Sequence, residues 1–449
     1  MGVICKDSST HKRPEEQITA TIASLGLKVA TGEENYAHRI LHSPIALKTC
    51  RVLSGMVDCL GVTENFKRVV DYFKTPAEET PAGFRVSFIP DRGKVLRADL
   101  VRDISYDRNG RKRPTKVLFS ADSANPYEVA PISGLLANLT CNPGIIYDLF
   151  INNPKANVGN KFKTRDEVMQ EIGRVLGPGV DISVELNDPF GASDAEILEE
   201  AARFKEMLSE YRVVIKVPHT GPVNGENVKE LLSGDKRLKR NYADCATVDA
   251  LRGHNLALML HEHGYRVNFT LMFEPYQTAL ALQARPYFIN SFIRHRLIQT
   301  HKMRHLLRHY AIEGETAYLE TLRAYMLETD YLCPAECDTD LHKVRAKAEH
   351  ILRYRQADSE EGDDGLDGIR HNLRVMRQCN MEDTRLILCS MEGESNYPDI
   401  DRLLYSDEFV DMADKIVITA EPAYLARFTS TNQVVSYQRR FMNAANGMK

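Results

Sequence analysis

Eight short β-type segments, separated by amphipathic helical stretches, constrain the fold of this chain more than any other feature of its sequence. Strands that alternate with helices pair in parallel through right-handed crossovers, and eight such units favour closure into a barrel over an open sheet. We therefore predict an α/β fold, a (β/α)8 TIM barrel over residues 116–449. The predicted strands are Val117–Ala121, Leu136–Asn142, Ile182–Asn187, Val213–Pro218, Arg266–Leu271, Tyr287–Phe292, Leu386–Ser390 and Ile416–Ala420.

Polar residues lie in or at the carboxyl ends of the first six predicted strands. Barrel enzymes place their catalytic groups at this end, so the strand ends of a closed barrel would gather these residues on one rim. A single polar residue there is commonly a strand-end cap, but a set from six consecutive strands indicates an active site. The set is Asp122, Asn142, Glu185, Lys216, Asn268 with Thr270, and Asn290.

Lys216 is the most informative member of this set, because it lies inside the apolar segment Arg212–Pro218. A lysine surrounded by apolar side chains loses solvation, so we expect its pKa to fall and its neutral amine to attack carbonyls. The alternative is a lysine that extends from the strand end into water. The accompanying carboxylates Asp122 and Glu185 favour the chemical interpretation.

The order of these segments resembles the transaldolases and the related fructose 6-phosphate aldolases, which are Schiff-base barrels. The resemblance runs from about Val117 to Phe292. The segments that carry it are Ser120-Ala121-Asp122-Ser123, Leu139-Thr140-Cys141-Asn142-Pro143-Gly144-Ile145-Ile146, Ser183-Val184-Glu185, Ile215-Lys216-Val217-Pro218-His219-Thr220 and Val267-Asn268-Phe269-Thr270-Leu271-Met272-Phe273, followed by Gln277 and Ala279.

The resemblance implies a catalytic role for four residues. Lys216 would form an imine with a ketose carbonyl, and the protonated imine would act as the electron sink for carbon–carbon cleavage. Asp122 would take the proton from the C4 hydroxyl of the donor. Glu185 and Thr270 would relay protons through a bound water during carbinolamine dehydration. Because the imine serves as electron sink, we expect no cofactor.

The resemblance also implies substrate-binding residues, and these include the first departures from the family pattern. Neutral amides bind hydroxyls without adding charge to the iminium, which suits Asn142 and Asn268. After the sixth strand the family typically reads Ser-Pro-Phe-Val-Gly-Arg. In this chain Asn290 replaces the serine and His295 stands at the phosphate-binding arginine, so Arg294 or Arg296 would have to substitute.

The segment after the seventh strand departs further. The family's Ala-Ser-Phe-Arg becomes Cys389-Ser390-Met391-Glu392, which places Ser390 and the carboxylate of Glu392 on the substrate side. A carboxylate would repel a phosphate dianion by several kcal/mol on an order-of-magnitude estimate. We therefore hypothesise a modified, unphosphorylated or cationic acceptor. The alternative is a loop shift that turns Glu392 into solvent while another arginine takes over.

Two segments exceed a minimal barrel. Residues 1–115 form a predicted extension, with helix-like spacing over Ile18–Leu27, His38–Leu60 and Phe66–Phe73 and a small β or loop element over Gly83–Tyr106. We expect this extension to pack as a cap, with partner binding as the alternative. Residues 296–383 form an insertion between strands six and seven. It begins with His301, His305 and His309 at helical spacing, which we interpret as a solvated basic face.

Composition excludes several classes of protein. A formal net charge of −4 gives no global reason to expect nucleic acid or an anionic membrane as partner, so small-molecule chemistry is the better expectation. The family resemblance implies that the small molecule is a sugar or sugar phosphate. There is no apolar signal core and no membrane-length apolar stretch, which predicts a cytoplasmic protein. Nine scattered cysteines indicate reduced thiols, and Cys333 and Cys337 lack the second pair of a zinc site. We predict no metal.

Together these observations predict a transaldolase-like enzyme that transfers a dihydroxyacetone-type unit from a ketose to an aldehyde acceptor, with a homodimer as a possible assembly. An aldolase that acts on a ketose without transfer is the alternative within the same chemistry. A non-catalytic barrel that binds a partner is the alternative from another class. The joint presence of Asp122, Glu185, Lys216 and Thr270 argues against it, because buried charge is costly without a chemical use.

Overall fold

The computed structural model describes residues 19–107, 111–219, 221–355, 365–389 and 393–448, and the chain divides into two compact units, Met1–Lys112 and Arg113–Lys449. The second unit contains a closed barrel of eight parallel strands, as predicted. The expected contributions of Ser390 and Glu392 lie outside the described residues.

The first unit is a small α/β fold built on two sheets. One sheet has the order β2-β4-β6-β5, in which β5 runs antiparallel to β6 and the other pairs are parallel. Leu60, Phe66 and Leu96 are fully buried in its core. The elements are β1 Thr19–Thr21, β2 Lys28–Val29, β3 Pro44–Ala46, β4 Cys59–Val62, β5 Phe84–Asp91, β6 Val95–Arg102, α1 Glu34–Ala37, α2 Leu47–Leu53 and α3 Glu64–Tyr72.

Two helix predictions in this unit are wrong. The segment Ile18–Leu27 holds strand β1 and a short 3-10 helix, Ile22–Leu25, and helix α2 covers only part of His38–Leu60, which ends in strand β4. Short apolar runs fit a buried strand as well as a helix, so their spacing alone does not decide between them. The predicted helix at Phe66–Phe73 is found as α3, and Gly83–Tyr106 forms the antiparallel pair β5 and β6.

The barrel of the second unit follows the chain order of its strands and closes between β14 and β7. All eight predicted strands are found within one or two residues of their expected ends. They are β7 Leu118–Asp122, β8 Leu136–Cys141, β9 Asp181–Glu185, β10 Arg212–Pro218, β11 Val267–Met272, β12 Phe288–Phe292, β13 Arg385–Cys389 and β14 Ile416–Ala420.

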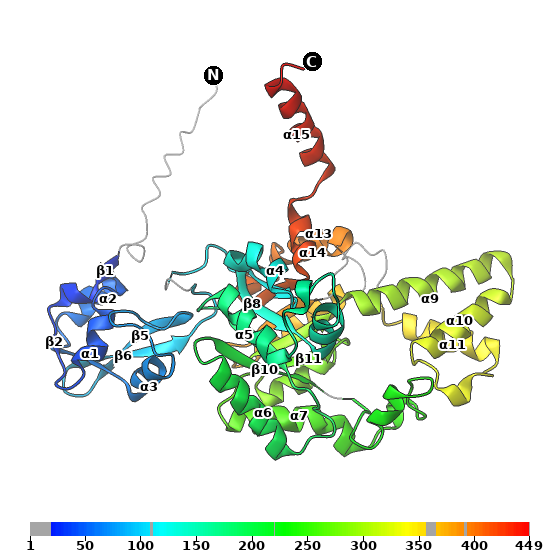
Figure 1. Ribbon diagram of the computed structural model, residues 1–449, viewed down its shortest axis with the longest axis horizontal. Helices are drawn as coiled ribbons and strands as arrows, with labels where there is room; N and C mark the ends of the chain where they lie inside the picture. Colours follow the sequence, from blue (N-terminus) through cyan, green and yellow to red (C-terminus); the bar gives the residue numbers. More distant parts are fainter. Residues whose placement is uncertain (1–18, 108–110, 220, 356–364, 390–392, 449) are drawn as a thin grey trace, which may run out of the picture. The chain divides into compact units, whose positions relative to one another are not determined.

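Helices surround the barrel, and the chain marks where several of them begin (Figure 1). Capping boxes open two of them: Thr164 with Glu167 before α5, and Ser193 with Glu196 before α6. The helices are α4 Pro126–Val129, a π-helix at Ile145–Ile151, α5 Arg165–Leu176, α6 Asp194–Met207, α7 Thr247–Glu262, α8 Gln277–Ala281, α12 Leu366–Gln378, α13 Gly393–Leu404 and α14 Pro422–Ala426. Helix α15, Asn432–Ala445, projects away from the barrel and contains no buried residue (Figure 1).

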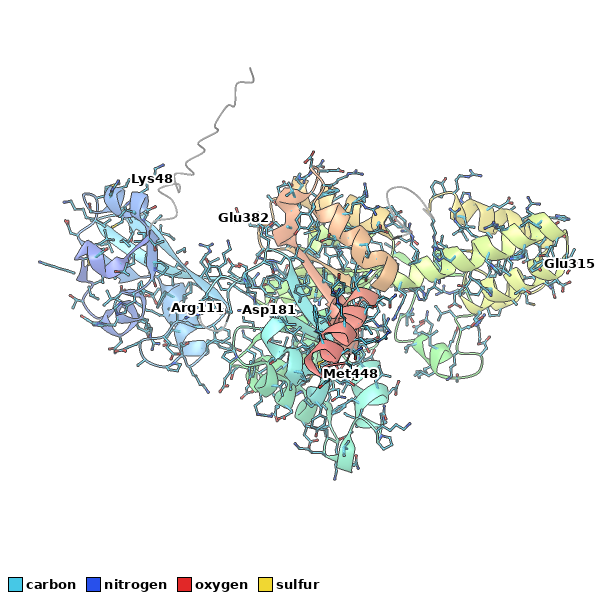
Figure 2. All side chains as sticks on the ribbon, turned by 90° about the horizontal axis from the view of Figure 1, so that it is seen from above. Lys48, Arg111, Asp181, Glu315, Glu382 and Met448 are labelled. Carbon is cyan, nitrogen blue, oxygen red and sulfur yellow. The ribbon has the colours of Figure 1, made fainter. Side chains whose placement is uncertain are left out.

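The insertion between β12 and β13 is largely helical. Helix α9, Arg294–Glu313, leads away from the barrel, and Glu315, in the turn before α10, lies at the far end of the insertion (Figure 2). Helices α10, Ala317–Glu328, and α11, Leu341–Leu352, pack against α9 through a separate apolar core that includes Met303, Leu322 and Val344. The insertion is thus a packed subdomain with its own core.

None of the helices that the structure describes is both long enough and apolar enough to span a bilayer.

Candidate active site

The carboxyl ends of neighbouring strands bring Lys216 and Glu185 together. Strand β10 pairs with β9 so that Lys216 stands opposite Glu185, and with β11 so that Lys216 stands opposite Asn268. The Nζ atom of Lys216 lies 3.0 Å from Oε2 of Glu185 and 3.5 Å from the carbonyl oxygen of Cys141. The Lys216 residue is only 3% exposed. A buried ammonium therefore contacts a carboxylate at the rim where the sequence predicted the site.

The pKa of Lys216 is raised above its ordinary value, which contradicts the expectation that burial would lower it. Burial does disfavour the ammonium, but the nearby carboxylates of Glu185 and Asp122 stabilise it and outweigh that effect. The sequence-based argument counted the apolar strand and neglected the two charges that the barrel places beside it. The lysine is stored as an ammonium and needs a proton acceptor before it can act as a nucleophile.

Asp122, the last residue of β7, adds a second carboxylate at the same end of the barrel. Burial raises its pKa to about 6, and repulsion from Glu185 and Glu421 acts in the same direction, while Lys216 opposes it. Its Oδ1 atom is buried and has no hydrogen-bond partner. A carboxylate with this pKa exchanges protons near neutral pH, as a general base requires.

Other polar atoms inside the barrel are also left without a partner. Oδ1 of Asn268 and Oδ1 of Asn290 are buried and accept no hydrogen bond, although both residues are almost fully enclosed. Buried polar atoms are usually satisfied, so these two oxygens are free to accept a hydrogen bond from a water or a ligand hydroxyl. The side-chain hydroxyls of Thr140 and Thr419 are likewise buried without a hydrogen-bond partner.

A chain of hydrogen bonds crosses the barrel interior among four polar residues of β7, β8, β9 and β11. Nδ2 of Asn268 donates to Oγ of Ser183 at 3.0 Å, and Ser183 donates to Oδ1 of Asn138 at 3.2 Å. Nδ2 of Asn138 donates to Oγ of Ser120 at 2.8 Å. This chain of hydrogen bonds fixes the orientation of the Asn268 side chain. Sequence reasoning assigned no role to Asn138, Ser183 or Ser120, although all three lie in the predicted strands.

Two predicted site residues have structural partners. Oδ1 of Asn142 accepts a hydrogen bond from the backbone N–H of Ile145, the first residue of the π-helix that follows β8, at 2.9 Å. Thr270 is buried in β11 opposite Pro218, and its carbonyl oxygen accepts from the backbone N–H of His219 at 3.1 Å. Thr270 thereby holds the end of the Lys216 strand.

Arg165 holds the end of the strand that carries Glu185 through hydrogen bonds. Sequence reasoning did not predict this residue. Its Nη1 donates to the carbonyl oxygen of Glu185 at 3.3 Å and to Oδ1 of Asn187 at 2.8 Å. Its Nη2 pairs with Glu200 at 2.6 Å, and its guanidinium lies 4.5 Å from the ring centroid of Phe204. Arg165 is therefore a positioning residue for the Glu185 strand end.

His219, directly after β10, is a further residue of the rim. Its Nε2 lies 3.4 Å from Nδ1 of His254, and its ring packs 4.7 Å from that of Phe269. Burial, together with His254, lowers the pKa of His219 to about 4, so this imidazole is neutral at physiological pH. Its Nδ1 is buried without a partner. The only sequence signal was its position three residues after the lysine.

A cavity of about 620 Å³, here called the distal pocket, opens beyond the ends of three of the same strands. His219 follows β10, Phe273 and Glu274 follow β11, and His295 follows β12 within it. The insertion supplies further walls. Its remaining described lining residues are Tyr242, Tyr276, Gln277, Leu280, Arg296, Gln299, Thr329, Asp330, Tyr331 and Arg355.

The two arginines that the sequence offered as anion contacts have different surroundings. Arg296 is 2% exposed in the wall of the distal pocket, and its Nη atoms pair with Glu274 at 3.3 Å and Asp367 at 2.7 Å. Arg294 begins α9 and is partly buried. The charge of Arg296 is thus already matched by two carboxylates.

Metal ligands do not gather in the part of the chain that the structure describes, where no three histidine, cysteine or acidic side chains could hold one ion. His301, His305 and His309 line an open groove of about 910 Å³ on the insertion, together with Arg304 and Arg308. The eight described cysteines form no disulfide.

Comparison with known families agrees with this geometry. Residues 119–318 match the family model described as transaldolase/fructose-6-phosphate aldolase, a segment that contains Asp122, Glu185, Lys216 and Thr270. A search of curated proteins found no match to the chain. The family match confirms the resemblance drawn from the strand ends and supports an aldolase-type function in general. The family is enzymatic.

Proposed function

We propose that this chain, whose barrel matches the transaldolase/fructose-6-phosphate aldolase family, makes and breaks carbon–carbon bonds of ketose sugars through a Schiff base on Lys216. The observation that carries the proposal is the 3.0 Å contact between the buried ammonium of Lys216 and Glu185. Asp122 adds a second carboxylate with a raised pKa. A buried lysine between two carboxylates is poorly explained by stability, because desolvation opposes the pairing, and well explained by proton transfer.

Imine formation would begin with loss of a proton from Lys216 to the carboxylate of Glu185, and their 3.0 Å contact supports this transfer. The amine nitrogen then bonds to the ketose carbonyl carbon, and the carbonyl oxygen becomes the hydroxyl of a carbinolamine. That hydroxyl takes up a proton and leaves as water, which produces a protonated imine. Glu185 and Thr270 would relay these protons through a bound water.

Cleavage of the carbon–carbon bond uses Asp122 as base. Its carboxylate removes the proton from the C4 hydroxyl, the C3–C4 bond breaks, and an aldehyde leaves. The electron pair of that bond moves into the iminium, which becomes an enamine. An acceptor aldehyde then captures the enamine, and hydrolysis of the new imine frees Lys216. The net reaction transfers a dihydroxyacetone-type unit; an aldolase would protonate the enamine instead.

Trapping of the imine tests the proposal. Native protein is incubated with a panel of ketoses and ketose phosphates, reduced with borohydride, and analysed by intact mass. A stable adduct is expected in the native protein and in Lys205→Met, which removes a lysine from the surface helix α6, but not in Lys216→Met. Absence of an adduct with every ketose would refute imine chemistry.

A second measurement distinguishes transfer from simple aldol cleavage. The donor ketose that forms the adduct is incubated with and without acceptor aldehydes. Release of product that requires an acceptor supports transfer, whereas steady release of free dihydroxyacetone without one supports the aldolase alternative.

A further inference from the structure

Glu274 lies between two buried arginines in the wall of the distal pocket. Its Oε2 is 3.3 Å from Nη1 of Arg296, and its Oε1 is 3.3 Å from Nη2 of Arg355. The residues Arg296 and Arg355 are 2% and 9% exposed. Two guanidinium groups that converge on one point form an anion site, and here a side chain of the protein occupies that point.

Further contacts fix this arrangement. Nη2 of Arg355 donates to the hydroxyl oxygen of Tyr331 at 2.7 Å, and its Nη1 donates to Oγ1 of Thr300 at 3.3 Å. Nη2 of Arg296 pairs with Asp367, the second residue of α12, at 2.7 Å. These partners come from three parts of the insertion, namely α9, α12 and the segment between α10 and α11, so the arginines are held in place from several sides.

The formal charges around the pocket cancel. Among its described lining residues, Arg296 and Arg355 are matched by Glu274 and Asp330, and Asp367 adds a further negative charge against Arg296. The neighbouring surface is aromatic, with Phe273, Tyr276 and Tyr331 among the walls. A dianion that entered here would meet no net positive charge, whereas an uncharged hydroxylated group would find both apolar faces and hydrogen-bonding atoms.

The position of the pocket relates it to the lysine. It lies beyond the carboxyl ends of β10, β11 and β12, and the ring of Phe273 packs 4.9 Å from that of Phe292, the last residue of β12. Two residues earlier on this strand is Asn290, whose Oδ1 is buried and accepts no hydrogen bond. His219, three residues after Lys216, also lines the pocket, so we take a sugar bound at Lys216 to extend past the end of β12 toward the distal pocket.

We propose that Glu274 is a specificity-determining residue, which occupies the anion position between Arg296 and Arg355 so that the distal pocket accepts the uncharged end of a sugar and excludes a phosphate. This inference rests on the proposed imine chemistry at Lys216. It predicts that the native protein reacts with unphosphorylated ketoses in preference to their phosphates.

The test compares the rate of borohydride-trapped adduct formation with fructose and with fructose 6-phosphate. The native protein should favour fructose. Glu274→Gln removes the competing charge and keeps the size of the side chain, so the ratio of rates should shift toward the phosphate by roughly tenfold or more. Glu274→Asp retains the charge and should retain the native preference. Glu320→Gln, which removes an exposed carboxylate of α10 that does not line the pocket, serves as a matched control with little expected change.

Each outcome has a distinct meaning. A native preference for fructose 6-phosphate, or an unchanged ratio in a folded Glu274→Gln protein, overturns the inference and leaves the imine chemistry standing. Absence of any adduct overturns the proposed function and the inference with it. If Glu274→Gln does not fold, inorganic phosphate is added to the native protein during fructose trapping. No protection of Lys216 at millimolar phosphate is expected, and clear protection would refute the exclusion of phosphate.

Discussion

Replacement of Asp122 by asparagine should stabilise the barrel at neutral pH, because the native carboxylate is buried at a cost. The pKa of Asp122 is raised from 3.8 to about 6, chiefly by burial. A folded-state pKa above the unfolded value means that the native protein binds this proton more tightly than the unfolded chain does. The stability associated with the proton is therefore fully present below about pH 4 and is lost as the pH rises through about 6.

The size of the effect follows from the shift. A difference of about 2 pKa units corresponds to roughly 3 kcal/mol at pH values well above 6. Asparagine has no such titration, so the stability of Asp122→Asn relative to native protein should increase by about 2 kcal/mol between about pH 4.5 and pH 7.5. The difference across pH is the decisive quantity, since it cancels any constant effect of the substitution on packing.

Urea unfolding followed by circular dichroism measures this difference, and it suits a chain that contains no tryptophan. Only the transition that includes the barrel should move. Asp148→Asn replaces an exposed aspartate of the same barrel and should run parallel to native protein. If Asp122→Asn and native protein also show parallel stability curves over this pH range, Asp122 does not carry the raised pKa and the argument for it as a base near neutral pH fails.

Three further predictions follow from the same structure. If Asp122 acts as the base, kcat/KM for ketose cleavage should fall about tenfold per pH unit below about pH 6, because only the ionised carboxylate accepts the proton; a flat acid limb would contradict this role. Gly253→Ala should lower both the stability of the barrel and the rate of imine trapping, because a Cβ there would overlap the carbonyl oxygens of Pro218 and His219 at the end of the Lys216 strand. The control Gly134→Ala meets open space and should have a mild effect. Equal effects of the two substitutions would show that the close approach at Gly253 is unimportant. Arg212→Met should lower the free energy of unfolding, measured by urea titration, by roughly 3–5 kcal/mol, because it leaves the fully buried Asp181 without its ion pair. The control Arg174→Met, at the exposed pair with Glu171, should cost below about 1 kcal/mol. Similar values for the two variants would contradict a buried pair.

The barrel could be predicted from sequence because its evidence is local. Each strand is a short apolar run, and parallel closure forces all carboxyl ends onto one rim, so Lys216 and Glu185 could be placed together without a structure. The direction of the lysine's pKa shift could not be predicted in this way. It depends on whether burial or the distance to two carboxylates dominates, and a strand pattern carries no distances.

The distal pocket could not be predicted for a related reason. Glu274 follows β11, Arg296 lies in α9, and Arg355 comes after α11, so three separate segments meet only through the packing of the insertion. No periodic pattern in the chain signals such a meeting. The same limit applies to the strands β1 and β4 in the first unit, which are too short for their apolar spacing to distinguish them from helix.

The pairing of Lys216 with Glu185 also limits the side reactions of the lysine amine. An ammonium has no lone pair, so it cannot condense with the reducing sugars and aldehydes that diffuse through any metabolically active solution. A lysine held in this form beside a carboxylate is protected against chance glycation. Under the proposed mechanism, Lys216 would become reactive only when a bound ketose allows its proton to move to a carboxylate. The contact with Glu185 that supports the proposed nucleophilic role of Lys216 thus also keeps its amine unreactive before a ligand binds.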